Sequence, residues 1–243
     1  MSKRRGGVVI AGVILVIVGV LICCISVFAM GFDFGRSDGE TYKVTQYEVS
    51  QEFSDVKIWA SVDDVEFVLS NDGKCAVECH EMEGIHHEVK VENGTLMISV
   101  KDEREWYQHF RFWTRSPKIT VMLPKTALGS LSVETNTGDL KIPEGFTFTD
   151  VDVQVGTGDV KFENVIASGE MRIKTNTGDI HLQECDAATV SLKTNTGDVT
   201  GSFLSEKVFS VKTNVGDVDV PQSKTGGKCE IVTNVGDVQF EIK

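Results

Sequence analysis

The feature that most constrains this chain is a repeat of close to twenty residues in its C-terminal half. The hexapeptide KTNTGD stands at 174–179 and again at 193–198. Six equivalent turns align on their glycines, with spacings of 20, 20, 19, 19 and 20 residues. These glycines are Gly138, Gly158, Gly178, Gly197, Gly216 and Gly236. A period this regular is typical of repeat architectures, in which each repeat forms one structural unit.

Apolar residues hold fixed positions around every turn and alternate with polar residues. One such column lies on the N-terminal side of the turns: Val133, Val153, Ile173, Leu192, Val211 and Ile231. Another lies on the C-terminal side: Leu140, Val160, Ile180, Val199, Val218 and Val238. Period-two alternation on both sides of a glycine turn indicates two short strands per repeat. One repeat is too short to bury its apolar face alone, whereas stacked repeats turn each column into a continuous core.

We therefore predict an all-β fold, a β-solenoid similar to a parallel β-helix, with six regular coils over residues 131–243. An antiparallel meander or sandwich is the alternative, but it does not explain the single phase of the turns. Residues 45–130 are expected to form irregular capping coils, because ASVDDVEF at 60–67 parallels TNVGDVQF at 233–240. Asn93-Gly94 between two alternating segments predicts a tight hairpin turn.

The first thirty residues differ in composition from the rest. Three basic residues precede an apolar run of 23 residues from Val8 to Met30. A helix of this length extends about 34 Å, enough to cross a hydrocarbon core of about 30 Å. The run is too long for a cleaved signal peptide and lacks its small-residue cleavage pattern. We expect a cytoplasmic flank at 1–7, a transmembrane signal anchor at 8–30 and a linker at 31–44, in a single-pass protein of the cell membrane with its C-terminal domain outside.

The part of the chain that follows the apolar run is strongly acidic. It holds all 36 Asp and Glu residues but only 21 of the 24 Lys and Arg residues, so its net charge is 21 − 36 = −15. Such a charge argues against nucleic acid as a partner and against bulk electrostatic adhesion to anionic lipid.

Four cysteines lie outside the apolar run: Cys75, Cys79, Cys185 and Cys229. An even number of external cysteines suggests disulfides. The register places Cys185 and Cys229 two or three coils apart, however, beyond the Cα separation of about 7 Å that a disulfide allows. Cys75 and Cys79 alternate along an extended segment, so they cannot share one zinc ion even with His86 and His87 nearby. We predict that all four cysteines belong to the core.

The polar residues of the turns have a structural interpretation. Glycine supplies a positive φ, an aspartate after it can bond back to the turn backbone, and asparagines can form a ladder between coils. The asparagines are Asn136, Asn176, Asn195, Asn214 and Asn234. The aspartates are Asp139, Asp159, Asp179, Asp198, Asp217 and Asp237.

Stacking would bring the six aspartates into a file, in which neighbours about 5 Å apart repel by roughly 0.8 kcal/mol in water. They are therefore the weak candidates for a calcium array, although the known calcium-binding solenoid repeat is nine residues long with paired glycines. A catalytic site as in sugar-cleaving β-helices needs an acid and a base with different pKa values in one cleft. Six equivalent carboxylates do not provide that difference, so we expect no catalytic residue, no metal and no cofactor.

One segment, 101–118, breaks the alternation with five aromatic residues among charged ones. These are Trp106, Tyr107, Phe110, Phe112 and Trp113. The segment is too polar for a core strand, and we interpret it as a helix or loop that either covers the first coil or contacts a ligand, a glycan or a membrane surface. It is the predicted binding site.

The chain resembles the bacterial putative-adhesin family, whose members are β-strand-repeat envelope proteins of largely unknown function. The resemblance rests on ETNTGDLKI, KTNTGDIHL, KTNTGDV and TNVGDVQF, on ITVMLPK before the regular coils, and on the single apolar run. It covers about residues 45–243, and no catalytic residue carries over with it. Some relatives look like envelope proteins of Gram-positive bacteria linked to cell-wall stress systems, which implies such a role here.

We thus expect a non-enzymatic, membrane-anchored surface protein that presents a rigid repetitive face to a protein or glycan partner. The alternative is a sensory or regulatory envelope protein that acts on a membrane partner through its single span. A calcium-binding or carbohydrate-active β-helix is a third interpretation.

Overall fold

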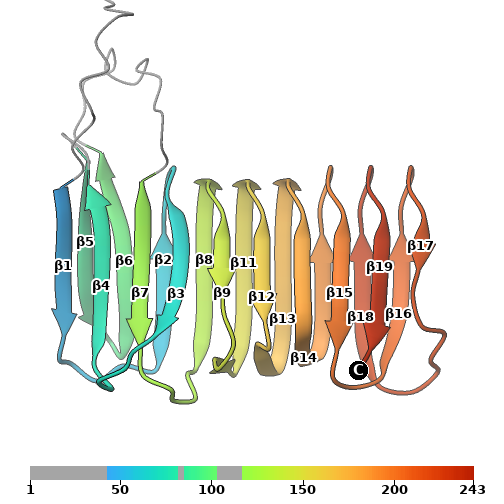
Figure 1. Cartoon of the computed structure of the whole chain (residues 1–243), viewed down its shortest axis with the longest axis horizontal. Helices are drawn as coiled ribbons and strands as arrows, with labels where there is room; N and C mark the ends of the chain where they lie inside the picture. The colour runs from blue at the N-terminus through green and yellow to red at the C-terminus, as the bar shows by residue number, and fades with distance from the viewer. Residues whose placement is uncertain (1–42, 82–84, 103–116) are drawn as a thin grey trace, which may run out of the picture. The chain divides into compact units, whose positions relative to one another are not determined.

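Figure 1 shows the computed structural model of the chain, which describes residues 43–81, 85–102 and 117–243. Tyr42–Lys243 forms one compact unit, distinct from the unit Met1–Thr41. The predicted signal anchor at 8–30 and nearly all of the linker lie outside the described residues. Within the described ranges, no helix combines the length and the apolar character needed to cross a membrane.

The described part of the compact unit is all-β, as predicted: its nineteen strands join in one mixed sheet, most of them paired in parallel. The strands fall into two halves, here named sheet A and sheet B, and β14 (Ile180–Lys193) contributes its first part to sheet A and its last part to sheet B. A coil consists of a strand of sheet B, a glycine turn and a strand of sheet A.

In spatial order, sheet B contains β5 (Ile85–Glu92), β6 (Thr95–Asp102), β2 (Asp55–Trp59), β8 (Ser130–Thr137), β11 (Asp150–Thr157), β13 (Ile166–Thr177), β14, β18 (Gly227–Val232) and β16 (Lys207–Lys212). The short β10 (Thr147–Phe148) pairs with the start of β13. Sheet A contains β1 (Lys43–Val49), β4 (Cys75–Glu81), β7 (Lys118–Leu123), β3 (Asp64–Leu69), β9 (Leu140–Ile142), β12 (Val160–Glu163), β14, β15 (Val199–Phe203), β19 (Val238–Ile242) and β17 (Val218–Asp219).

The predicted apolar columns are confirmed as in-register ladders. Val133 pairs with Val153, Val153 with Ile173, and Ile173 with Leu192. Members of both columns are almost fully buried in one continuous core, apart from those in the outermost coil. The stack is therefore stabilised by apolar burial along its whole length, because each coil covers the apolar layer of the next.

The coils do not stack in chain order at either end (Figure 1). At the C-terminal end, β18 lies between β14 and β16, and β19 lies between β15 and β17. The last coil of the chain is thus inserted between two coils that precede it. At the other end, β2 and β3 lie inside β6 and β7, although they come first in the sequence.

The N-terminal end of the stack is capped by antiparallel strands. β4 pairs with β7, β1 with β4, and β5 with β6, whereas the other named pairings are parallel. Asn93 and Gly94 both have positive φ and join β5 to β6, which confirms the predicted hairpin turn. Asp64 takes the place of the repeat aspartate, because Val65 pairs with Leu140. β6 extends to Asp102 and β7 starts at Lys118, so the ends of the predicted insertion belong to strands.

Replacing Gly178 by alanine should destabilise the stack. Its φ is +134°, and a Cβ there would collide with the carbonyl oxygen of Gly158 in the adjacent coil. We expect a loss of about 2–4 kcal/mol in the free energy of unfolding of a 42–243 fragment, measured by urea denaturation. Gly73→Ala is the matched control, since Gly73 has φ +74° but no atom near the added Cβ. Equal losses in the two variants would contradict the close approach of the turns.

Candidate functional site

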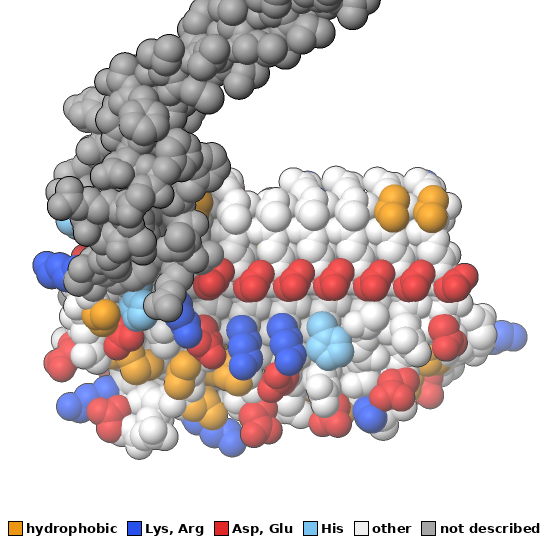
Figure 2. Space-filling model, turned by 45° about the horizontal axis from the view of Figure 1, so that its top comes forward, with side chains coloured by type: hydrophobic (Ala, Val, Ile, Leu, Met, Phe, Trp, Pro, Cys, Tyr) orange, Lys and Arg blue, Asp and Glu red, His pale blue; other side chains and the backbone are white. Residues whose placement is uncertain are grey.

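The turns form one continuous surface, here named the turn edge, which consists of the asparagine, threonine or valine, and aspartate positions of the six turns. Figure 2 shows the aspartates as a straight file along the stack. Five of the six aspartates use the carboxylate in the same way: Asp139 Oδ1 accepts the N–H of Asp159, and Asp159 Oδ1 accepts that of Asp179, both at 2.8 Å. Asp64 extends the file by accepting the N–H of Asp139 at 3.0 Å, whereas Asp217 in the outermost coil donates its N–H to Asp237. These bonds offset the repulsion between neighbouring carboxylates, because the inner carboxylates are each bound to a backbone donor.

Asparagine and threonine side chains also join successive turns. Asn214 Nδ2 donates to Asn234 Oδ1 at 3.0 Å, and Asn234 Nδ2 donates to Asn195 Oδ1 at 3.2 Å. The buried hydroxyl of Thr194 donates to the carbonyl of Gly178 in the adjacent coil at 3.3 Å. The turn residues thus have an architectural use that accounts for their repetition.

The aspartates of the file do not form a cluster that could hold a metal ion. Within the described ranges, no group of three or more His, Cys, Asp or Glu side chains has the arrangement needed to hold a metal ion. Successive aspartates are parallel copies that bind backbone N–H groups, so they do not converge on one point.

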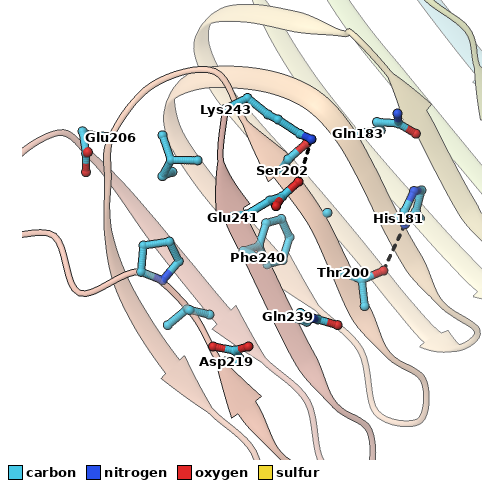
Figure 3. A pocket seen from close by; sticks show the side chains of 14 residues that line it. His181, Gln183, Thr200, Ser202, Glu206, Asp219, Gln239, Phe240, Glu241 and Lys243 are labelled. Carbon is cyan, nitrogen blue, oxygen red and sulfur yellow. Dashed lines mark hydrogen bonds and ion pairs between the residues drawn. The ribbon is translucent and has the colours of Figure 1, made fainter.

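The described residues also form an open groove on sheet A near the C-terminal end (Figure 3), with a volume of about 950 Å³. Hydrogen-bonding side chains line it: His181, Gln183, Thr200 and Gln239, together with the buried Ser202, which accepts the N–H of Glu184 at 2.9 Å. Charged side chains also line it: Glu206, Asp219, Glu241 and Lys243. His181 Nδ1 lies 3.0 Å from Thr200 Oγ1, and Lys243 pairs with Glu241 at 2.8 Å.

The groove exists because the outermost strand of sheet A is short. β17 pairs with β19 only at Val218 and Asp219. Pro221, which lines the groove, has no N–H to continue the pairing, and proline ends or interrupts strands for this reason. The last part of β19 is therefore left without a strand partner on that side, and Phe240, a buried residue of the core, lies at the base of the groove.

A buried polar cluster lies in the N-terminal cap. The imidazole of His87 is fully buried between two carboxylates, with Nε2 3.2 Å from Asp63 Oδ1 and Nδ1 3.5 Å from Glu81 Oε1. Glu81 Oε1 also accepts the N–H of His87 at 2.8 Å, and Glu81 Oε2 accepts the hydroxyl of Thr45 at 2.7 Å. The single proton of the Tyr47 hydroxyl is shared between the carbonyl of His87 at 2.8 Å and Glu81 Oε1 at 3.2 Å. The cluster joins β1, β4, β5 and the turn before β3.

Two pKa values follow from this environment. Burial opposes ionisation of Glu81, but the hydrogen bonds from His87, Thr45 and Tyr47 outweigh it and lower the pKa of this carboxyl. Burial, together with the charge and hydrogen bond of Glu81, raises the pKa of Tyr47 to about 12. The cap is thus built around an ionised Glu81.

The four cysteines are buried, as predicted, and each is a free thiol. Burial raises the pKa of Cys75 to about 11 and those of Cys79, Cys185 and Cys229 to about 12. A thiol with such a pKa is almost entirely protonated at neutral pH, and a protonated thiol is a poor nucleophile.

The predicted binding residues Trp106, Tyr107, Phe110, Phe112 and Trp113 lie outside the described residues. Sequence reasoning missed both the groove and the cap cluster. One signal was present for the cluster: Asp63 stands where the regular turns have glycine, as the alignment of 60–67 with 233–240 shows. A carboxylate in this position needed a partner, and His87 is that partner.

Replacing Glu81 by glutamine should change the acid sensitivity of the cap. The folded-state pKa of Glu81 lies below its ordinary value of 4.5, so its stabilising contribution is complete above that value and is lost as the pH falls through the folded-state pKa. We expect Glu81→Gln to cost about 1–3 kcal/mol at pH 7, with the difference from wild type shrinking towards pH 3, in urea unfolding. The exposed Glu48→Gln on β1 is the control. A difference that stays constant between pH 7 and pH 3 would be inconsistent with an ionised Glu81.

Two solved structures share the fold. One is a protein from Bacteroides fragilis NCTC 9343 described as a putative adhesin, with a TM-score of 0.55 and 19% identity, covering 83% of this chain and 99% of that chain. The other is described as a putative cell adhesion protein from Clostridium sporogenes ATCC 15579, with a TM-score of 0.51, 14% identity and coverages of 83% and 100%. No curated protein matches the sequence.

The family Toastrack DUF4097 matches residues 53–243, which is most of the chain and includes every regular coil. The resemblance to β-strand-repeat, adhesin-like proteins is thereby confirmed at the level of the family. The chain belongs to the Toastrack DUF4097 family.

Proposed function

We propose that this chain is a non-enzymatic, adhesin-like binding protein of the cell envelope. Residues 8–30 anchor it in the membrane with the N-terminus in the cytoplasm, and the stack of coils lies outside. The stack binds a protein or glycan partner through the groove on sheet A. Two structural neighbours are described as a putative adhesin and a putative cell adhesion protein, which supports an adhesin-like role. Neither description names a partner.

The observation that carries the proposal is the chemistry of the groove. Gln183 and Gln239 offer exposed amide groups and Thr200 a hydroxyl group, all of which both donate and accept hydrogen bonds. Hydroxyl-rich glycans and extended peptide backbones present the complementary groups. Thr200 pairs with His181 of β14 and with Gln239 of β19, and this pairing fixes the spacing of the side chains, so little ordering is needed when a partner binds.

The non-enzymatic part of the proposal rests on the groups that could do chemistry. The four described thiols are buried with raised pKa values, and the aspartates of the turn edge are bound to backbone N–H groups. In the groove, His181 bonds to a hydroxyl and Glu241 pairs with Lys243. This arrangement supplies hydrogen-bonding groups for recognition rather than an activated nucleophile with its base.

The test compares a double glutamine variant of the groove with a single glutamine variant elsewhere, on cells that display the full chain. The double variant Gln183→Ala, Gln239→Ala removes two amides from the groove. We expect it to reduce binding to an array of cell-wall and host-surface glycans and proteins by at least tenfold, because two groups that contact the partner are lost. Gln154→Ala is the matched control, since Gln154 is an exposed amide on β11 in sheet B.

A second change separates the adhesin-like role from a sensory one. Replacing residues 8–30 by an unrelated apolar helix should leave binding unchanged. Loss of binding or of an envelope-stress response after this exchange would favour the regulatory alternative. Unchanged binding in the groove variant would contradict the proposed site.

A further inference from the structure

The outermost coil at the C-terminal end has an open edge. β16 pairs with β18 on one side, and β17 pairs with β19 on one side, and among the described residues neither has a partner on the other side. At the opposite end of the stack, β1, β4 and β5 cover the parallel coils with antiparallel strands. The N-terminal end of the stack is therefore capped by antiparallel strands, whereas the C-terminal end is not capped within the described residues.

The backbone of β16 shows which groups face outward. The carbonyls of Glu206 and Lys212 accept bonds from Gly227 and Thr233 of the β18 side, so even-numbered residues direct their N–H and C=O groups inward along the sheet. Because this direction alternates along a strand, Phe209 and Val211 direct theirs to the open edge. These four backbone groups are in the geometry to extend sheet B by one strand.

The side chains of this coil are also incompletely covered. Phe209 and Val211 are only partly buried, although their counterparts in the inner coils are fully buried. Seven large hydrophobic side chains are exposed among the described residues, and five lie in or beside the two outer coils: Leu204, Val208, Val215, Val218 and Val235. Between its terminal lysines Lys207 and Lys212, β16 carries only uncharged side chains, so the middle of the open edge lacks the charges that often block pairing at exposed edges.

The charge of the outer coil permits a second copy to approach. Residues 204–227 hold three lysines (Lys207, Lys212 and Lys224) and three acids (Glu206, Asp217 and Asp219), so their net charge is zero. The rest of the chain beyond residue 30 carries the whole net charge of −15, so this is the face where two copies repel least.

We propose that β16 is the interface of a two-fold dimer, in which it pairs antiparallel with β16 of a second copy around Ser210. This register places Phe209 of one copy opposite Val211 of the other, on the core side. Phe209 and Val211 of each copy then cover the partly exposed apolar layer of the other copy. The N–H and C=O groups of these two residues form hydrogen bonds across the interface. The antiparallel pairing of β4 with β7 and of β5 with β6 shows that such a strand can close a coil of this stack. A two-fold contact is closed, so it yields a dimer and not a fibre. The dimer does not depend on the groove or on the proposed binding function.

The test is disulfide trapping of the full chain in detergent. Ser210→Cys places a thiol at the two-fold axis, next to its copy in the partner. Ser191→Cys is the control: Ser191 lies in the same outward row of sheet B, where it pairs with Glu230, and Glu230 pairs with Ser210. Both variants keep all native cysteines, so crosslinking through these is a common background. We expect at least tenfold more linked dimer from Ser210→Cys than from Ser191→Cys under mild oxidation.

A third variant tests the edge itself. Val211→Pro removes an outward N–H that makes no bond to β18, and proline is tolerated at such edge positions. Combined with Ser210→Cys, it should reduce trapping to the level of the control while the circular dichroism spectrum stays that of β structure. Equal trapping from Ser210→Cys and Ser191→Cys overturns the proposal, as does undiminished trapping in the folded proline variant. If the proline variant does not fold, the comparison of the two cysteine variants decides.

Discussion

The structure depends on the contact between one turn and the next. A backbone N–H of each turn reaches the aspartate of its neighbour, and the glycine beside it leaves room for the carbonyl of the adjacent coil. This contact fixes the register, and the register in turn aligns the apolar columns that form the core. A shift by one residue would move every core side chain to the solvent face, which is why the turns repeat more strictly than the strands. The repeated aspartates thus serve the fold, and the turn edge gains its regular surface as a consequence.

The two ends of the stack differ from its regular middle coils in strand pairing and in polar contacts. At the N-terminal end, antiparallel strands and the ionised Glu81 hold the cap around the buried His87. At the C-terminal end, the chain returns between earlier coils, so β19 pairs with β15 along its length and with β17 at its first two residues, while β16 and β17 become the edge. The short β17 opens the groove, because it pairs with only the first two residues of β19. The groove follows from the early end of pairing before Pro221, whereas the open edge follows from the position of β16 and β17 as the outermost strands.

The columns, the two strands per repeat and the hairpin at Asn93-Gly94 were predictable, because periodicity and turn chemistry are local properties. The exchanged order of the coils was not. Leu192, Ile231 and Val211 belong to one column and are chemically alike, so the pattern does not distinguish whether the coil of Val211 or that of Ile231 follows Leu192. The cap cluster was hidden for a related reason, since Asp63 and His87 are 24 residues apart and meet only in the folded chain. The groove required knowledge of both the coil order and the length of β17.

The order of the coils is the central claim, because the groove, the position of β19 between β15 and β17, and the open edge all depend on it. It is tested by intramolecular disulfide formation in a 42–243 fragment that carries paired cysteines. Ser191 and Glu230 are direct partners across β14 and β18, at a separation between parallel strands, about 4.8 Å, that suits a disulfide. The pair Ser191→Cys, Glu230→Cys should form an intramolecular disulfide, whereas the pair Ser191→Cys, Ser210→Cys should not, because a strand lies between them. Efficient linkage of the second pair without the first would show that the coils stack in chain order and would contradict the structure described.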